Sequence, residues 1–188
     1  MYINISYRLV LTNKNIINLK ERQINNINIY ILSPFPYYMK RTQLRSKEIS
    51  KELEPFGMEL NKKDVVEKVE EVHTFLVINK QPAFWYYQQK LVPTLRYLQQ
   101  HDLLKKIIVD MGAVKFVVNG ADIMRPGITE IDADIKKDEF IVVVDETNKK
   151  PLAVGLALFT GTEMQQMTTG KVIKNIHYVG DEIWKEEV

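Results

Sequence analysis

Hydrophobic positions in the middle of the chain first follow a helical period and then alternate. Apolar residues recur near helical spacing between Lys40 and Phe56, with charged residues between them, as on an amphipathic helix. Pro55 and Gly57 stand where such a helix would end, because proline and glycine interrupt helices. The pattern therefore predicts a helix that begins at Lys40.

The next segment has the pattern of a hairpin. Valine alternates with charged residues over 64–71, and the apolar run 72–78 continues this pattern as a buried strand. A polar turn at 79–82 and an aromatic run at 83–89 predict the returning arm. Pro93 then fits the first turn of a helix in which leucines recur at helical spacing.

After residue 108 the chain consists of short apolar runs between turn residues. Seven of the eight glycines lie between 112 and 180, a spacing typical of the corners of a small barrel. The expected elements are a strand at 105–110, a short helix at 111–118, a strand at 121–124, apolar strands at 138–146 and 151–159, a helix from Thr162 to Gly170 and final strands at 171–184. We predict an α+β protein in which an α/β module precedes a pseudo-β-barrel, packed together through a short linker near residue 108.

Residues 1–38 differ in composition from the rest, with eight isoleucines and seven asparagines. One interpretation is a translated upstream region, with Met39 as the natural start. The other is a genuine N-terminal strand or arm, because residues 28–32 and their neighbours alternate and can form an edge strand. The sequence leaves both open for this N-terminal extension.

Composition excludes several classes of site. The chain has no cysteine, which removes disulfides, thiolate zinc sites, iron–sulfur clusters and cysteine nucleophiles. The three histidines have no ligand spacing, no serine stands in a nucleophile elbow, and no phosphate-binding P-loop sequence is present. We expect no enzyme activity, no metal and no cofactor.

The charge is unevenly distributed. The net charge of +2 is the sum of +3 for residues 1–38, +4 for residues 39–115 and −5 for residues 116–188. The C-terminal part has a net negative charge, so it would have to bind nucleic acid through a local basic patch and not through its overall electrostatic field. No apolar run approaches the length that crosses a bilayer, and the N-terminus lacks a signal-peptide pattern. We expect a cytoplasmic protein without a membrane partner.

The stretch from Asp110 to Ile128 carries the candidate chemistry. Gly120 tolerates a positive φ, and Ala121 keeps the same surface low. A flat partner can then approach the main chain beside the positive charge of Arg125, which suits a nucleotide or phosphate. Taken alone, a Gly-Ala corner followed by Pro-Gly is more often an ordinary turn.

The same stretch resembles the signature of the PUA domain, a small RNA-binding pseudo-barrel found in pseudouridine synthases and archaeosine transglycosylases. Together with the segments 92–98, 153–159 and 175–184, it is similar to the malignant T-cell amplified sequence family, in an archaeal-type member. The resemblance covers residues 39–188. It implies a pre-PUA module at 39–108 and a PUA domain at 109–188.

The resemblance also implies a function. Family members act in translation, in initiation or recycling, on tRNA or the small ribosomal subunit, and eukaryotic members pair with density-regulated protein. The implied RNA ligand is a tRNA acceptor end or ribosomal RNA. The RNA-binding surface carried over onto this sequence is Lys115, Gly120, Ala121, Asp122, Met124, Arg125, Lys171, Lys174 and Asn175.

Other interpretations remain open. The acidic C-terminal part also suits an adaptor that binds a protein, and a PUA domain can deliver RNA to a separate modifying enzyme. The aromatic run 84–87 suggests base stacking, but we expect one alternating pair in the core and the other packed on the helix at 40–54 or on a partner. Trp184 is expected to seal the barrel.

Overall fold

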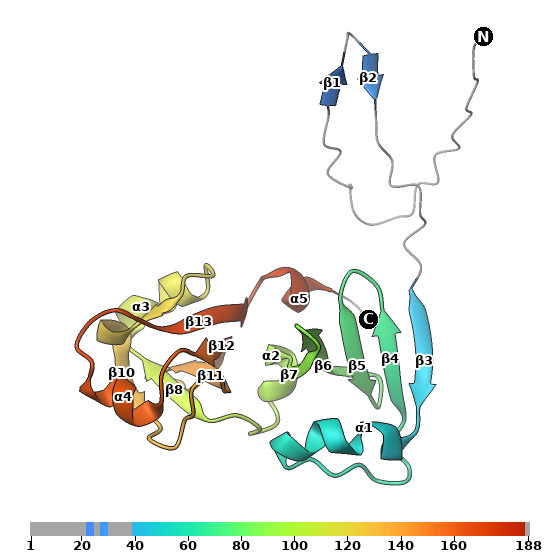
Figure 1. Ribbon diagram of the computed structural model, residues 1–188, viewed down its shortest axis with the longest axis horizontal. Coiled ribbons are helices and arrows are strands. Elements are labelled where there is room, and N and C mark those ends of the chain that lie inside the picture. Colours follow the sequence, from blue (N-terminus) through green and yellow to red (C-terminus); the bar gives the residue numbers. More distant parts are fainter. Residues whose placement is uncertain (1–21, 25–26, 30–38, 187–188) are drawn as a thin grey trace. The chain divides into compact units, whose positions relative to one another are not determined.

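The computed structural model describes residues 22–24, 27–29 and 39–186 (Figure 1). Residues 1–37 and 38–188 form two compact units. In the first unit, β1 (Arg22–Ile24) and β2 (Ile27–Ile29) pair as an antiparallel two-stranded sheet. Most of the strand expected at 28–32 lies outside the described residues. Both interpretations of residues 1–38 therefore remain predictions.

The predicted pre-PUA module, residues 39–108, is built on an antiparallel meander of five strands in sequence order. Phe75 lies opposite Trp85, which confirms the predicted hairpin. The strands are β3 (Lys40–Leu44), β4 (Val66–Glu70), β5 (Thr74–Ile78), β6 (Gln81–Tyr87) and β7 (Lys90–Pro93).

The helix predicted from Lys40 is wrong in its first part. Residues 40–44 form the edge strand β3, and the helix α1 (Ser46–Leu53) begins only after Arg45. The side chain of Arg41 reaches Glu67 on the neighbouring strand. Pairing with β4 stabilises residues 40–44 as a strand. The local helical spacing does not contain this distant partner. A 3-10 turn, η1 (Glu54–Phe56), follows α1.

Two further expectations for this module need correction. The segment 64–78 is not one continuing pattern, because a turn at 71–73 separates β4 from β5. The helix after Pro93 is a single turn, α2 (Leu95–Leu98), and Pro93 itself ends β7. Thr94 caps α2 by accepting a hydrogen bond from the main-chain N–H of Tyr97 at 3.2 Å, so the proline precedes the helix.

The PUA domain is a six-stranded sheet in the order β10-β8-β11-β12-β13-β9. Its strands are β8 (Lys106–Val109), β9 (Ile123–Met124), β10 (Ile128–Ile131), β11 (Phe140–Asp145), β12 (Pro151–Ala157) and β13 (Lys171–Tyr178). All neighbours are antiparallel except β8 and β11. The two outermost strands, β9 and β10, are joined by the 3-10 turn η2 (Arg125–Gly127), so the sheet curls into a nearly closed barrel.

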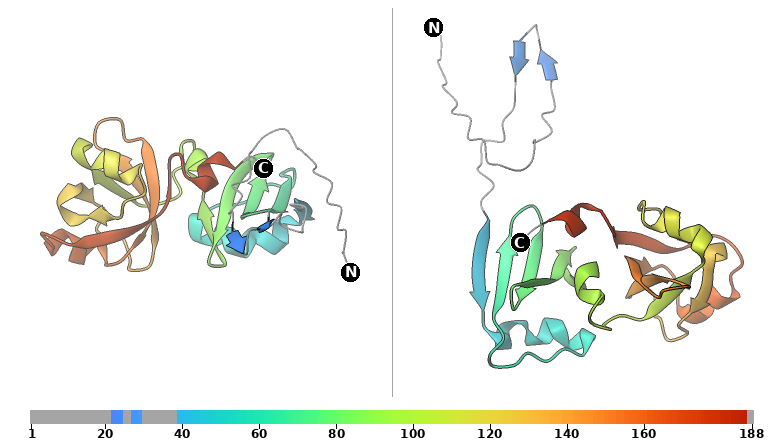
Figure 2. Two further views of the ribbon diagram at one scale, coloured as in Figure 1. Left: turned by 90° about the horizontal axis from the view of Figure 1, so that it is seen from above. Right: turned by 180° about the vertical axis from the view of Figure 1, so that it is seen from behind.

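Two short helices lie between the barrel strands, and a third follows the last strand. α3 (Met111–Val117) follows β8 as predicted. α4 (Gly161–Gln166) is capped by Thr160 and not by Thr162. The expected final strands are also wrong in part: after β13, Asp181 caps the helix α5 (Glu182–Lys185). Figures 1 and 2 show β13 leading from the barrel to α5, which lies beside the five-stranded sheet.

The pre-PUA module and the barrel share one buried cluster. Phe75, Trp85 and Leu95 pack with Val144 and Ile183, and this agrees with the packed arrangement expected from the short linker. Half-buried Trp184 packs against this shared cluster and does not seal the barrel, contrary to expectation.

The aromatic run 84–87 lies inside the protein. Phe84 and Trp85 are buried, and the flanking tyrosines are half-buried. Tyr86 donates to Glu52 of α1 at 3.1 Å, and burial together with this carboxylate raises the pKa of Tyr86 to about 12. Tyr87 faces Phe140 of the barrel. The packing interpretation is therefore confirmed over base stacking.

Candidate nucleic-acid interface

The helix α3 is held at its N-terminus by side-chain caps. The carboxylate of Asp110 accepts the main-chain N–H of Ala113 at 2.8 Å, and Glu146 accepts the N–H of Met111 at 3.1 Å. Both bonds satisfy donors that have no partner within a helix. Val117 is buried and anchors the inner face of the helix.

 An apolar groove runs between α3 and the segment from Ala121 to Gly127. Its volume is about 610 Å³, and its lining is mostly apolar. Phe116 and Met124, on opposite sides, are 57% and 50% exposed, unusually high for such large apolar side chains at a groove.

A close contact that the sequence did not reveal explains why residue 120 is a glycine. Its φ is +82°, and a Cβ at this position would lie 2.7 Å from the ring of Tyr178. The flat group that approaches Gly120 is therefore the ring of Tyr178, which belongs to the same chain. Ala121, next to it, is exposed and lines the groove.

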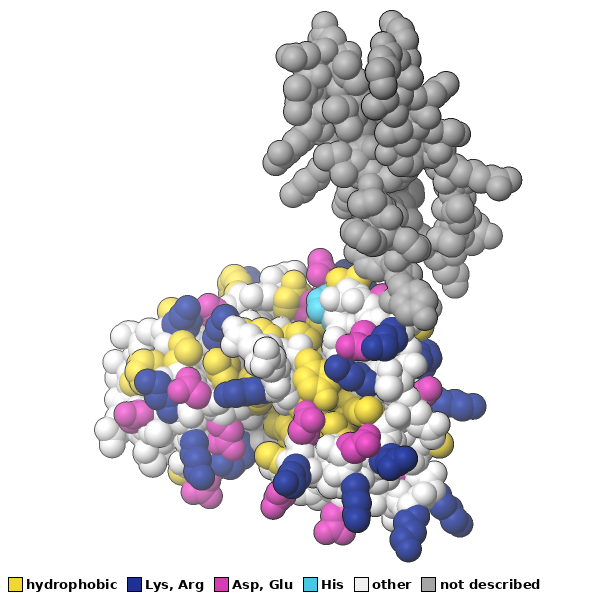
Figure 3. All heavy atoms as spheres, turned by 45° about the vertical axis from the view of Figure 1, so that its right-hand side comes forward, with side chains coloured by type: hydrophobic (Ala, Val, Ile, Leu, Met, Phe, Trp, Pro, Cys, Tyr) yellow, Lys and Arg dark blue, Asp and Glu magenta, His cyan; other side chains and the backbone are white. Residues whose placement is uncertain are grey.

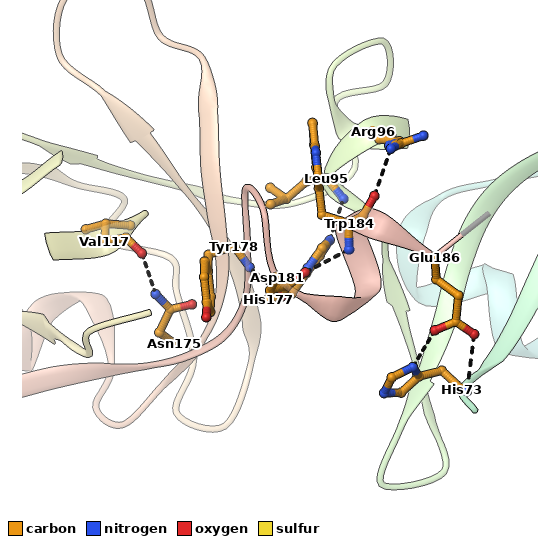
Figure 4. Close-up of polar contacts among 10 residues, drawn as sticks. All are labelled: His73, Leu95, Arg96, Val117, Asn175, His177, Tyr178, Asp181, Trp184 and Glu186. Carbon is orange, nitrogen blue, oxygen red and sulfur yellow. Dashed lines mark hydrogen bonds and ion pairs between the residues drawn. The ribbon is translucent and has the colours of Figure 1, made fainter. Parts of the chain in front are cut away.

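Asn175 and Asp122 hold the loop after α3 in place. The side-chain amide of Asn175 donates to the carbonyl oxygen of Val117 at 3.0 Å (Figure 4) and to that of Ala121 at 3.1 Å. Asp122 accepts the main-chain N–H of Asn175 at 2.9 Å. These bonds position the groove, and they leave the amide nitrogen of Asn175 engaged within the protein.

Arg125 is also engaged within the protein. Its Nε donates to the carbonyl oxygen of Met164 at 2.7 Å, and its Nη1 donates to that of Ile128 at 3.1 Å. The main-chain N–H of Arg125 donates to Gly170 at 2.8 Å. This guanidinium ties η2 to α4, so its position favours a structural role over the phosphate contact suggested by the sequence.

The three lysines of the predicted surface have different surroundings. Lys115 is exposed on α3, with its Nζ 4.8 Å from the centre of the Phe116 ring. Lys171 pairs with Asp122 at 3.1 Å, beside the groove. Lys174 points instead to the pre-PUA module, where it donates to the hydroxyl of Tyr87 at 3.2 Å.

The structure therefore divides the predicted surface. Ala121, Asp122 and Met124 line the groove, with Lys115 and Lys171 next to lining residues. Gly120, Arg125 and Asn175 shape it from within, and Lys174 lies at the junction of the modules.

Sequence reasoning missed two exposed apolar residues of α3. Met111 is 50% exposed, and Phe116 lines the groove. The signal was present, because at about 100° per residue Phe116 lies roughly 200° around the helix from the inward-facing Val114. The helical period therefore places Phe116 on the outer face of α3, on the side of the groove.

The modules are joined by a buried histidine. Nε2 of His177 accepts the main-chain N–H of Leu95 at 3.2 Å, and its Nδ1 lies 2.8 Å from Asp181 (Figure 4). Burial raises the pKa of Asp181, but hydrogen bonds from His177 and from the N–H groups of Trp184 and Tyr178 outweigh it and lower the pKa below its usual value. This network fixes β13, whose Asn175 holds the loop beside the groove.

Two negative observations apply to the part of the chain that the structure describes. No three His, Asp or Glu side chains there are grouped as metal ligands. No helix there is long and apolar enough to cross a membrane.

Comparisons with known proteins place these features in a family. A model of the PUA domain matches residues 105–179. A protein of Methanocaldococcus jannaschii, described as uncharacterized, is 41% identical over 79% of this chain and 94% of its own length. Human malignant T-cell-amplified sequence 2 is 34% identical over 65% of this chain and 72% of its own length. The chain belongs to the malignant T-cell-amplified sequence family.

Further relatives agree with this membership. Translation machinery-associated protein 20 of Schizosaccharomyces pombe is 36% identical over 54% of this chain and 59% of that protein. A hypothetical protein of Pyrococcus horikoshii, solved by crystallography, superposes with a TM-score of 0.70 at 33% identity, over 79% of this chain and all of the other. The predicted α+β fold with a PUA pseudo-barrel is confirmed for this member of the family.

Proposed function

We propose that the protein is a non-catalytic RNA-binding protein that acts in translation, in initiation or recycling, and that its PUA domain binds a tRNA acceptor end or ribosomal RNA of the small subunit. Its place of action would be the cytoplasm. A partner similar to density-regulated protein fits the same proposal, as the family resemblance implies.

The groove beside α3 is the observation that carries the proposal. Phe116 and Met124 present apolar surface to solvent, and Lys115 adds an exposed positive charge next to Phe116. Unpaired bases stack on exposed rings and apolar groups, while cations contact phosphates. A groove of about 610 Å³ has the volume of a small-ligand site, which suits one or two unpaired nucleotides better than a duplex.

Family membership supports the link to translation. A relative is named translation machinery-associated protein 20, and the matched PUA domain spans the barrel that carries the groove. Neither observation identifies the RNA, so the tRNA end and the ribosomal RNA are separated by experiment.

Binding to two purified RNAs tests the proposal. The protein is titrated against a folded tRNA with its 3′ end intact and against the same tRNA with the unpaired end removed, and small ribosomal subunits are tested by co-sedimentation. We expect Phe116→Ala to weaken binding about tenfold, from loss of one stacking contact. Exposed Gln100, replaced by alanine, serves as the control. Equal binding by wild type and Phe116→Ala to every RNA would contradict the proposal.

An adaptor that binds a protein is the second candidate, and the charge of the PUA part favours it. Residues 116–188 carry 8 basic and 13 acidic residues, an unfavourable overall field for RNA. A partner that binds the groove without RNA, with affinity insensitive to salt, would support this alternative.

A further inference from the structure

A group of exposed cations lies at one end of the pre-PUA sheet. The strand ends Leu44, Val66, Ile78 and Gln81 form one row, because Leu44 pairs with Val66, Val66 with Ile78, and Ile78 with Gln81. The segments that continue directly from this row are two loops and the first turn of α1, and they carry five exposed basic residues, here called the sheet-end patch: Arg45, Lys47, Lys62, Lys63 and Lys80.

Hydrogen bonds connect the loops of the sheet-end patch. Asn79 donates from its side chain to Asp64 at 2.9 Å and from its main chain to Val65 at 2.9 Å. Asp64 also accepts the N–H of Asn61 at 2.7 Å. The loop with Lys62 and the turn with Lys80 are thus held side by side, so their positive charges are presented on a defined surface.

The charges of the patch are not neutralised by ion pairs within the described residues. None of the five takes part in an ion pair there, whereas Lys40, Arg41 and Lys68 of the same sheet pair with glutamates. Two acidic groups of these segments are engaged with main-chain groups: Glu48 accepts the main-chain N–H of Arg45, and Asp64 accepts that of Asn61. Figure 3 shows lysine and arginine side chains gathered at the lower right, over the pre-PUA module.

We propose that the sheet-end patch is a second RNA-binding surface, which contacts the phosphate backbone without reading sequence. This inference rests on the proposed RNA-binding function and adds a contact outside the PUA groove. Lysine binds phosphate as a point charge, and four of the five cations are lysines. Protein interfaces are built around aromatic and apolar anchors, and Val65, 46% exposed, is the large apolar side chain that this patch offers.

Salt dependence of RNA binding tests the patch. The variant Lys62→Gln/Lys63→Gln/Lys80→Gln is compared with Lys136→Gln/Lys137→Gln/Lys150→Gln, which removes the same charge from exposed PUA positions. The probe is folded small-subunit ribosomal RNA, titrated over a range of salt. We expect the patch variant to lose about tenfold or more in affinity and to reduce the salt slope by about two, with a much smaller change in the control. Equal changes in both variants, or none, would overturn the patch.

A second measurement does not depend on net charge. Because the chain has no cysteine, a hydroxyl-radical source can be attached through Lys63→Cys or, as a control, Lys137→Cys. Defined RNA cleavage from position 63, with little from position 137, is expected. Absence of cleavage from position 63 while wild type binds the RNA overturns the patch but leaves the PUA groove proposal standing. Absence of RNA binding by wild type overturns both. Normal binding of the patch variant to naked RNA, with weakened binding to ribosomal subunits, points to an acidic protein and also overturns the inference.

Discussion

The main-chain N–H of Leu95 donates a hydrogen bond to Nε2 of the buried His177 side chain, at 3.2 Å. Leu95 begins α2 of the pre-PUA module, and His177 lies on β13 of the barrel. The imidazole is 1% exposed, so water does not replace this bond. The helix N-terminus of one module is therefore satisfied by a side chain of the other.

Replacement of His177 should lower the stability of residues 39–186 as a whole. His177→Ala leaves the N–H of Leu95 and one oxygen of Asp181 without partners and opens a cavity, which together cost about 3 kcal/mol in the free energy of unfolding. Denaturant unfolding measures this change. Gln100→Ala, at an exposed position, should change it by less than about 0.5 kcal/mol. A loss for His177→Ala no larger than in this control would contradict the account.

Asp181 should make stability depend on acidity. Its pKa is lowered in the folded protein, so the carboxylate binds a proton more readily in the unfolded chain. The stabilisation is fully present above the unfolded pKa of about 4 and is lost as the pH falls through the folded value. Asp181→Asn should be less stable at neutral pH, and the difference from wild type should shrink below about pH 4. A constant difference across that range would refute the prediction.

Gly120 and Gly180 form a matched pair for testing close packing. Both have positive φ, but a Cβ at Gly120 would meet Tyr178 at 2.7 Å, while Gly180 has nothing within 4 Å. Gly180→Ala should cost about 1 kcal/mol from the backbone alone. Gly120→Ala adds the steric clash and should cost at least about 2 kcal/mol. Thermal or denaturant unfolding gives both values, and equal costs would show that Tyr178 does not restrict this position.

Arg125 and Lys115 should separate stability from RNA binding. Arg125→Gln removes donors to two main-chain carbonyls and should lower the free energy of unfolding by about 1–3 kcal/mol, with the salt slope of RNA binding unchanged. Lys115→Gln should leave stability within about 0.5 kcal/mol and reduce the slope by about 0.7–0.9. Titrations at several salt concentrations, alongside unfolding curves, measure both. A reduced salt slope for Arg125→Gln with unchanged stability would instead indicate that Arg125 contacts RNA.

Local signals in the sequence predicted much of the barrel. The pair β11 and β12 follows two apolar runs joined by a short polar turn, and α3 follows a cap and a helical pattern. Residues 40–44 were predicted wrongly because their helical spacing is local, whereas the pairing of Arg41 with Glu67 is not. Local patterns do not contain the distant partner that decides between helix and strand.

The candidate site shows the same limit. The sequence placed Ala121, Asp122 and Met124 on one surface, and they line one groove. It did not reveal that Arg125 bonds to Met164 or that Tyr178 covers Gly120. Those roles depend on α4 and β13, which lie far along the chain, so residue type and spacing alone suggested ligand contacts.

Photo-crosslinking from position 116 tests the central claim most directly. Phe116 is replaced by benzoylphenylalanine, which preserves an exposed aromatic side chain at the groove, and the crosslinked material from cells is sequenced. The account predicts RNA attached at this position, enriched in tRNA 3′ ends or in small-subunit ribosomal RNA. The same substitution at exposed Lys150 should give little RNA. Crosslinks from position 116 to protein alone would contradict the account and favour the adaptor.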